Sequence, residues 1–240
     1  MTAGTKGVAR ADREAQIVEV ACRAFGENGY AATSVADVAE AAGISKPLIY
    51  NYFGSKDGLH AVCVEHAAAL LWAEFERSTA TGTVGLARAV LTLDGMFRAL
   101  APHPWIWRLV FDPTAPAEGV SRDALEAYED KLFTLGEDGV KELMRLAGNI
   151  DADDISAMHA VWESMFRSLV GWWLDHPGVS PEEMTERCVR MFGTVFGDLD
   201  GLELALRPGA APAAGATPGR AQGPAQGPAQ GPAQGPAQPR

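Results

Sequence analysis

The stretch from Thr33 to Leu59, TSVADVAEAAGISKPLIYNYFGSKDGL, decides how the rest of the chain is to be interpreted. Its first part carries apolar residues at helical spacing, and the same spacing resumes after a break of only a few residues. Gly43 lies in that break and can adopt a positive φ without a steric clash. Two short helices joined by so tight a turn are typical of a helix-turn-helix.

The second of these helices is expected over residues 46–53 and divides its side chains between two faces. Ile44 and Leu48 are expected to face the core, Ser45 to cap the helix, and Pro47 to occupy its first turn, where a missing amide hydrogen costs nothing. The outer face then presents side chains suited to phosphates and base edges: Ser45, Lys46, Tyr50, Asn51 and Tyr52. Simple packing of the two tyrosines within the domain is the alternative.

The same stretch closely resembles the helix-turn-helix signature of the TetR family of transcriptional regulators. The resemblance is strong over about residues 11–60 and rests on Thr33, Val38-Ala39, Gly43, Ser45-Lys46, Leu48, Tyr50, Tyr52-Phe53 and Ser55-Lys56. It implies a nine-helix, homodimeric, ligand-responsive DNA-binding protein, usually a repressor. It also implies DNA contacts from Thr33, Ser45, Lys46, Pro47, Tyr50, Tyr52 and Lys56, to which we add Asn51 as a candidate base reader. Lys56 as a solvated helix start is the alternative at that position.

The rest of the chain shows helical spacing and no sustained alternation, so we expect an all-α fold with a TetR-like architecture. Glycines and prolines mark where its helices begin and end. The predicted helices are Ala11–Glu27, Val35–Ala42, Lys46–Phe53, Lys56–Ser78, Val84–Leu100, Trp105–Phe111, Arg122–Leu146, Asp153–Leu174 and Pro181–Leu206.

Composition divides the chain into four segments. We expect a flexible N-terminal arm over residues 1–10, a DNA-binding domain over 11–55, and a helical domain for ligand binding and dimerisation over 56–207. From Pro208 the chain is rich in Ala, Pro, Gly and Gln, and AQGP repeats four times from Ala221. Because such a segment cannot offset its ordering entropy, we expect residues 208–240 to be disordered.

Charge is distributed unevenly along the chain. The 240 residues carry 20 basic and 31 acidic side chains, a net charge of −11, which taken alone argues against a nucleic-acid partner. Through Lys56, however, six basic residues balance six acidic ones, so the whole acidic excess follows Lys56. A neutral N-terminal part can therefore approach DNA while the acidic remainder cannot.

Cysteine usage and hydropathy bear on the compartment. Cys22, Cys63 and Cys188 are widely spaced and odd in number, which suits a reducing compartment rather than a disulfide framework. No apolar run reaches the 18 residues of a membrane span, and the N-terminus lacks an apolar signal segment. We expect a cytoplasmic protein with no membrane partner, metal or other cofactor.

Aromatic and methionine residues concentrate in the predicted helices between residues 56 and 174. This composition is shared by apolar ligand cavities and by ordinary cores. Guided by the family resemblance, we place in a cavity wall Trp72, Phe97, Trp107, Trp162 and Phe166, with three polar residues to orient a ligand, Asp94, Arg98 and His159. The alternatives are an i,i+4 ion pair for Asp94 with Arg98, and a hydrogen-bonded core histidine.

The last predicted helix carries apolar residues at alternating spacings of four and three, a narrow seam of coiled-coil type. The seam consists of Cys188, Phe192, Val195, Leu199, Leu202 and Leu206. Glycines at 193, 197 and 201 would allow close helix approach, although composition bias also explains them. In the resembled family the last two helices usually form a four-helix dimer interface, so we assign the seam to dimerisation.

These features predict a homodimeric repressor of a palindromic operator that is released by a small, mostly apolar ligand. An activator of the same fold, and a helical ligand-binding module without DNA binding, are alternatives. A more remote alternative is an all-α metal-dependent enzyme using His60, Cys63 and His66. These three residues lack zinc-like spacing, and no catalytic motif accompanies them.

Overall fold

The computed structural model describes residues 10–196, which form nine helices and contain no strand. The helices are α1 (Arg10–Ala32), α2 (Val35–Ala41), α3 (Lys46–Phe53), α4 (Lys56–Ala80), α5 (Gly85–Leu100), α6 (Trp105–Val110), α7 (Val120–Leu146), α8 (Ala152–Leu174) and α9 (Pro181–Phe196). The all-α prediction is confirmed over this part of the chain. The remainder of the predicted last helix, with Leu199, Leu202 and Leu206, lies outside the described residues, as do most of the expected arm and the whole expected tail.

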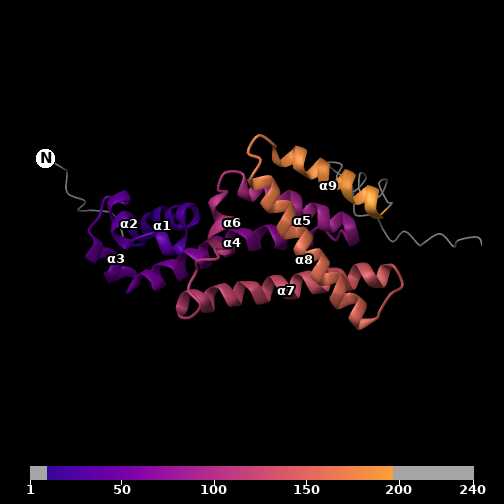
Figure 1. The fold of residues 1–240 in the computed structure, drawn as a ribbon, viewed down its shortest axis with the longest axis horizontal. Helices are drawn as coiled ribbons and strands as arrows, with labels where there is room; N and C mark the ends of the chain where they lie inside the picture. Colours follow the sequence, from indigo (N-terminus) through magenta and orange to yellow (C-terminus); the bar gives the residue numbers. More distant parts are fainter. Residues whose placement is uncertain (1–9, 197–240) are drawn as a thin grey trace, which may run out of the picture.

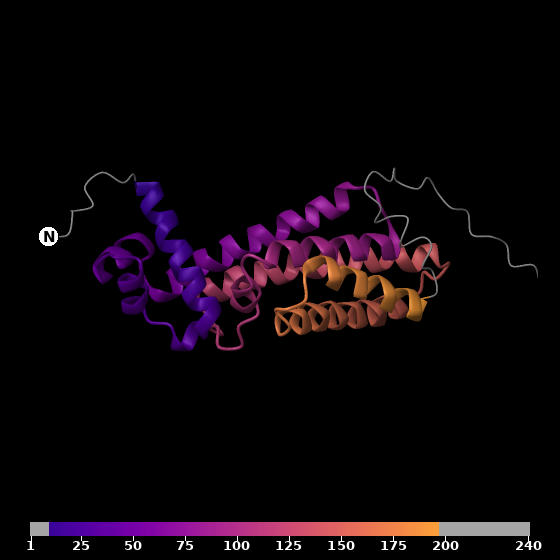
Figure 2. The same cartoon turned by 90° about the horizontal axis from the view of Figure 1, so that it is seen from above.

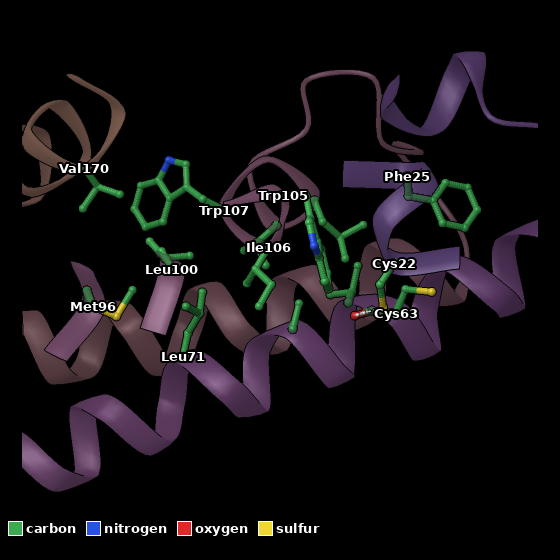
Figure 3. Close-up of a cluster of buried hydrophobic side chains, with 14 of the residues drawn as sticks. Cys22, Phe25, Cys63, Leu71, Met96, Leu100, Trp105, Ile106, Trp107 and Val170 are labelled. Atoms are coloured by element: carbon green, nitrogen blue, oxygen red, sulfur yellow. Dashed lines mark hydrogen bonds between the residues drawn. The ribbon is translucent and has the colours of Figure 1, made fainter. Parts of the chain in front are cut away.

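The described helices are arranged along one long axis (Figures 1 and 2). Helices α1–α3 gather at one end, α4 runs from them into the body, and α5–α9 make up the rest. One buried apolar cluster extends from Ile17 of α1 to Phe192 of α9. Figure 3 shows its central part, where Cys22 and Phe25 of α1 lie near Cys63 of α4 and Trp105 of α6. The expected boundary at residues 55/56 therefore does not separate two hydrophobic cores.

Local sequence features explain the compact N-terminal end. Ser34 and Ser55 cap α2 and α4, accepting hydrogen bonds from the amides of Asp37 at 3.1 Å and Gly58 at 2.9 Å. Gly43 has a φ of 64° in the turn between α2 and α3, as that turn requires. These caps and this turn fix how α3 is presented.

Within residues 10–196, no helix combines the length and the apolar character that a membrane span requires.

Candidate DNA-binding surface and ligand cavity

Helix α3 has one fully buried residue, and its outer face is exposed to solvent. Ile49 is completely buried, whereas Leu48, which we expected in the core, is only half-buried. The exposed positions are Ser45, Lys46, Pro47, Tyr50 and Asn51. The Ser45 hydroxyl makes no capping hydrogen bond, contrary to the role expected from its position. The helix thus presents a continuous set of hydrogen-bonding groups to solvent.

Cations lie over aromatic rings at and beside α3. The Lys46 ammonium is 5.8 Å from the centre of the Tyr50 ring, and the Arg10 guanidinium is 5.1 Å from that of Tyr52. At the start of α4, the Lys56 ammonium lies 4.2 Å from the ring centre of Tyr30. Such contacts hold positive charge in place without neutralising it, so the charge remains available to an anion.

Two of the expected DNA contacts are less accessible than the others. Tyr52 is half-buried, and its ring centre lies 5.9 Å from that of Phe53, so packing accounts for part of its role. Thr33 is only 5% exposed, and its hydroxyl is hydrogen-bonded to the carbonyls of Ala24 and Gly29. The cause is Gly29, whose φ of 79° kinks the end of α1 and turns Thr33 back onto it. We therefore correct the prediction for Thr33: its side chain is hydrogen-bonded to the end of α1 and is not available for a DNA contact.

The end of α1 is tied to the connection between α6 and α7. The backbone amide of Tyr30 donates to the Asp112 carboxylate at 2.5 Å, and that of Ala31 donates to the Thr114 hydroxyl at 3.2 Å. The same carboxylate accepts from the amide and hydroxyl of Thr114, so these hydrogen bonds also join residues within the connection. The end formed by α1–α3 and the body are thus linked by directional bonds as well as by apolar contact.

A second link is made by His60 of α4, which is fully buried. Its Nδ1 is hydrogen-bonded to the hydroxyl of Ser121 in the first turn of α7, and its ring meets those of Phe25 and Tyr30 at 4.8 and 4.9 Å. Burial lowers the pKa of His60 to about 4, against a smaller raising effect of Asp112 and Asp57. The sequence indicates His60 only as a possible metal ligand, because no local pattern predicts its contact with residue 121.

A cavity of about 440 Å³ lies in the body, bounded by residues of α4, α5, α7 and α8. Its walls are mainly aromatic and aliphatic, and they include three of the residues expected there, His159, Trp162 and Phe166. Residues that we did not place in the wall from the sequence also line it, among them Phe75, Phe111, Phe133 and Arg88. Three glycines of α5 and α7 also line it, Gly85, Gly136 and Gly139.

The other three aromatic predictions for the cavity are corrected. Phe97 is fully buried in the core, with its ring centre 5.1 Å from that of Trp173. Trp107 is also buried in that core (Figure 3), and its ring packs against Phe111 rather than lining the cavity. Trp72 lies beside the wall residue Phe75, and its indole N–H donates to Glu76 at 2.9 Å.

The expected polar pair Asp94 and Arg98 does not reach the cavity either. Arg98 forms an ion pair with Asp94 at 2.9 Å and another with Glu182 at 2.6 Å. The Thr185 hydroxyl also donates to Asp94, at 2.8 Å. The i,i+4 alternative is therefore correct, and the pair ties α5 to α9.

A second hollow, of about 460 Å³, adjoins the first and shares Phe111, Glu129 and Arg167 with it. Its lining includes Asp112 and Arg122. The connection that holds the end of α1 thus also borders the space next to the cavity.

Of the three expected seam residues on α9 that the structure describes, two are buried within the protomer and one is exposed to solvent. Cys188 is fully buried and Phe192 is 2% exposed, so neither side chain is accessible to a second copy of the chain. The reason is that α9 packs on α5, and Phe192 also meets the ring of Trp162 of α8 at 6.0 Å. Val195 is 73% exposed and remains a candidate for the dimer contact.

The residues considered for a metal-dependent enzyme do not come together. His60 and Cys63 are buried, with the Cys63 thiol facing the carbonyl of Val18 at 3.9 Å, while His66 is exposed. Burial raises the pKa of Cys63 well above its usual value, which disfavours the thiolate that a metal needs. Between residues 10 and 196, no group of three or more His, Cys, Asp or Glu side chains is placed to hold a metal ion.

A helix-turn-helix with an exposed, cation-bearing second helix, joined to a helical body with an apolar cavity, defines a class of DNA-binding regulators. Residues 17–62 match the model of the bacterial regulatory proteins of the tetR family. Over 71 residues the chain is 37% identical to the HTH-type transcriptional regulator BetI of Burkholderia thailandensis. This match covers 30% of the chain and 36% of BetI, so the similarity spans about a third of that relative's length.

Solved structures share the whole fold. A TetR-family transcriptional regulator from Bordetella parapertussis 12822 superposes with a TM-score of 0.63 at 22% identity, over 77% of this chain and 95% of that one. The transcriptional regulator FadR from Bacillus subtilis, solved in complex with stearoyl-CoA, gives a TM-score of 0.59 at 16% identity, over 80% and 97% of the two chains. Residues 17–62 thus carry a tetR-family region, and the described residues share the fold of solved TetR-family transcriptional regulators.

Proposed function

We propose that the chain is a homodimeric repressor that binds a palindromic operator through α3 and releases it when a small, mostly apolar ligand enters the cavity. The observation that carries this proposal is the outward face of α3, where Lys46, Tyr50 and Asn51 are exposed beside the buried anchor Ile49. DNA as the partner also implies that the protein acts in the cytoplasm.

The proposed DNA contacts divide by chemistry. Lys46 and Lys56 supply positive charge for phosphates, and Ser45, Tyr50 and Asn51 supply hydrogen-bonding groups for phosphates or base edges. Pro47 and Tyr52 border the same surface. The acidic excess follows Lys56, so the body would repel the duplex and favour approach by the end that carries α3.

Exposed apolar side chains on α8 and α9 support the homodimer. Val161 and Trp172 of α8 are 60% and 42% exposed, and Met191 of α9 is 41% exposed. On α8 the small residues Ser164 and Ser168 lie between the two at helical spacing, so another helix could approach closely. With Val195, these residues would form the interface. A two-fold dimer presents its two recognition helices to major grooves about 34–36 Å apart, which is why we expect a palindromic operator.

The connection between α6 and α7 offers a route from the cavity to α3. Phe111 belongs to the cavity wall, and the next residue, Asp112, accepts the hydrogen bond from the Tyr30 amide at the end of α1. A ligand that displaces Phe111 would shift this bond, and with it the angle of the DNA-binding helices. Release of DNA then follows if the ligand binds the displaced arrangement more tightly, because the two binding equilibria are linked.

The complex of the related FadR with stearoyl-CoA supports a small-molecule effector for a protein of this fold. In this chain the mainly aromatic and aliphatic wall of the cavity favours a mostly apolar effector.

Selection of operator sequences from random duplex DNA tests the proposal. The full chain should enrich two inverted half-sites, and the double variant Lys46→Ala/Tyr50→Ala should enrich nothing. Lys131→Ala, which alters an exposed lysine of α7, is the matched control and should select the same sequence as the wild type. Enrichment of a single asymmetric site would contradict the homodimer, and no enrichment by the wild type would contradict DNA binding. If a promoter assay shows activation, the protein is an activator and the proposed repressor role is wrong.

A further inference from the structure

We propose that the cavity takes an uncharged ring compound bearing one hydroxyl or carbonyl oxygen, and that this oxygen hydrogen-bonds to the imidazole of His159. The inference rests on the proposed function, since it assumes that the cavity of about 440 Å³ is the effector site. It adds the chemical class of the effector and the residue that selects it.

The walls favour flat, apolar groups. Aromatic rings enter the lining from four elements, with Phe75 on α4, Phe111 after α6, Phe133 on α7, and Trp162 and Phe166 on α8. The volume lies within the range of small-molecule sites, and rings of this kind are what an apolar ring system packs against. Phe133 is 56% exposed and borders the cavity on α7, so a bound ligand would also cover this apolar surface.

The charged groups of the wall are already neutralised. Arg88 pairs with Glu142 at 2.7 Å, Arg167 pairs with Glu163 at 2.8 Å, and Glu129 pairs with Arg122 at 2.7 Å. The remaining carboxylate, Asp130, is exposed to solvent. A charged ligand would have to remain without a counter-ion among the wall aromatics or separate one of these pairs, and separation costs most at Arg88–Glu142, the least exposed pair. An uncharged ligand meets neither cost.

The wall hydroxyls are also satisfied within the chain. Ser78 donates to the carbonyl of Phe75 at 2.9 Å, and the Thr92 hydroxyl is hydrogen-bonded to Ser78 at 2.8 Å and to the carbonyl of Arg88 at 2.9 Å. The Thr79 hydroxyl is hydrogen-bonded to the carbonyls of Phe75 and Glu76. None of these groups needs a ligand to complete its hydrogen bonds.

His159 is the exception in the wall. It is 5% exposed, and among residues 10–196 it has no hydrogen-bond partner, although its ring meets that of Phe133 edge-on at 4.6 Å. The alternative of a hydrogen-bonded core histidine is therefore not what the structure shows. A neutral imidazole carries one donor and one acceptor, so either a hydroxyl or a carbonyl of the ligand can satisfy it. The indole N–H of Trp162 also lacks a hydrogen bond within the described residues, but its side chain is only half-buried.

Space for this imidazole depends on a glycine. A β-carbon at Gly136 of α7 would lie 2.7 Å from Nε2 of His159, closer than side chains pack. Glycine in the middle of a helix is unfavourable relative to alanine, so its presence at the position that faces the imidazole is informative. Because Gly136 has no β-carbon, the imidazole of His159 can remain in the cavity wall.

A series of pyrene probes tests the proposal with the full chain. Pyrene, 1-pyrenemethanol, 1-pyrenemethylamine and 1-pyrenecarboxylate share one ring system and differ in one group. Their binding can be followed by energy transfer from tryptophan, because Trp162 lies in the wall. We expect 1-pyrenemethanol to bind at least about fivefold more tightly than pyrene, and both charged probes at least about tenfold more weakly than 1-pyrenemethanol.

Variants then identify the residue responsible. His159→Leu should bring 1-pyrenemethanol to the affinity of pyrene and leave the affinity for pyrene itself close to its wild-type value. His159→Gln should retain part of the preference. Gly136→Ala should reduce the preference by displacing the imidazole, and Gly171→Ala is its control, since a β-carbon at Gly171 would meet nothing within 4 Å.

Equal affinity of pyrene and 1-pyrenemethanol for the wild type would overturn the proposal, as would tightest binding of a charged probe or no binding of any probe. An alcohol preference that survives His159→Leu would overturn the role of His159. Operator DNA binding is measured separately: if 1-pyrenemethanol binds through His159 and DNA stays bound, ligand-driven release fails while the assigned ligand chemistry stands.

Discussion

The surface of α3 and the cavity of the body use their charged groups in opposite ways. On α3, Lys46 has no ion pair among the described residues and lies exposed beside Tyr50. Around the cavity, Arg88 and Arg167 are each paired with a glutamate. An unpaired exposed cation can exchange water and counter-ions for phosphate, whereas paired charges in an apolar wall favour a neutral guest. On the proposed function, one chain would combine a site for a polyanion with a site that disfavours ions.

The largest expected effect tests where the cavity ends and the core begins. Phe97→Ala should lower the free energy of unfolding by about 3–5 kcal/mol, because removing a fully buried ring leaves a void. Phe133→Ala, at a 56% exposed ring that borders the cavity, should cost under about 1 kcal/mol. Urea denaturation of both variants measures the difference. If both variants lose a similarly small amount of unfolding free energy, Phe97 belongs to the cavity wall and not to the core.

The next effect concerns the junction between the two regions, where His60 lies. Its pKa is about 4 in the folded chain and near 6.5 when unfolded, so between these values the unfolded state binds more protons. The free energy of unfolding should therefore fall by about 2 kcal/mol from this group as the pH drops from about 7 to about 5.

Urea unfolding at several pH values across this range measures the dependence, and His60→Asn provides the comparison because it removes the titrating group. The stability of the variant should fall less than that of the wild type over the same pH range. Parallel decreases in the two proteins would mean that His60 is not held neutral at the junction.

A smaller effect concerns the interface proposed for α8 and α9. Trp172→Ser should weaken self-association about tenfold or more, since an exposed tryptophan on an apolar stripe is typical of an energetically dominant contact. Leu70→Ser is the matched control, because Leu70 is exposed to nearly the same extent, 41%, but lies on α4. Sedimentation equilibrium measures the dissociation constants. An equal response of both variants would place the dimer contact elsewhere.

The two sites also differ in how far the sequence could predict them. The exposure of Lys46, Tyr50 and Asn51 follows from helical spacing around Ile49 and from the turn at Gly43, all within a few residues. The bounds of α3 were predicted to the residue for the same reason. Thr33 was misjudged because the kink at Gly29, which turns it inward, depends on contacts rather than on spacing.

The cavity depends on residues brought together from four helices. Periodicity shows which face of α5 or α8 is buried, but not whether that face meets another side chain or an empty space. Phe97 and Phe166 look alike in sequence, yet the first packs on Trp173 and the second lines the cavity. The sequence could not indicate that Gly136 belongs to the cavity wall, because its role depends on His159, which lies far from it in the sequence.

The most direct test of the central claim is the salt dependence of binding to the selected operator, compared between Lys46→Ala and Lys131→Ala. If α3 contacts the DNA backbone, Lys46→Ala should reduce the magnitude of the negative slope of log affinity against log salt by about 0.9 for each phosphate that the variant no longer neutralises. Lys131→Ala should leave the slope unchanged. Fluorescence anisotropy with labelled operator measures both slopes. Identical slopes for Lys46→Ala, Lys131→Ala and the wild type would contradict the assignment of α3 as the DNA-binding surface.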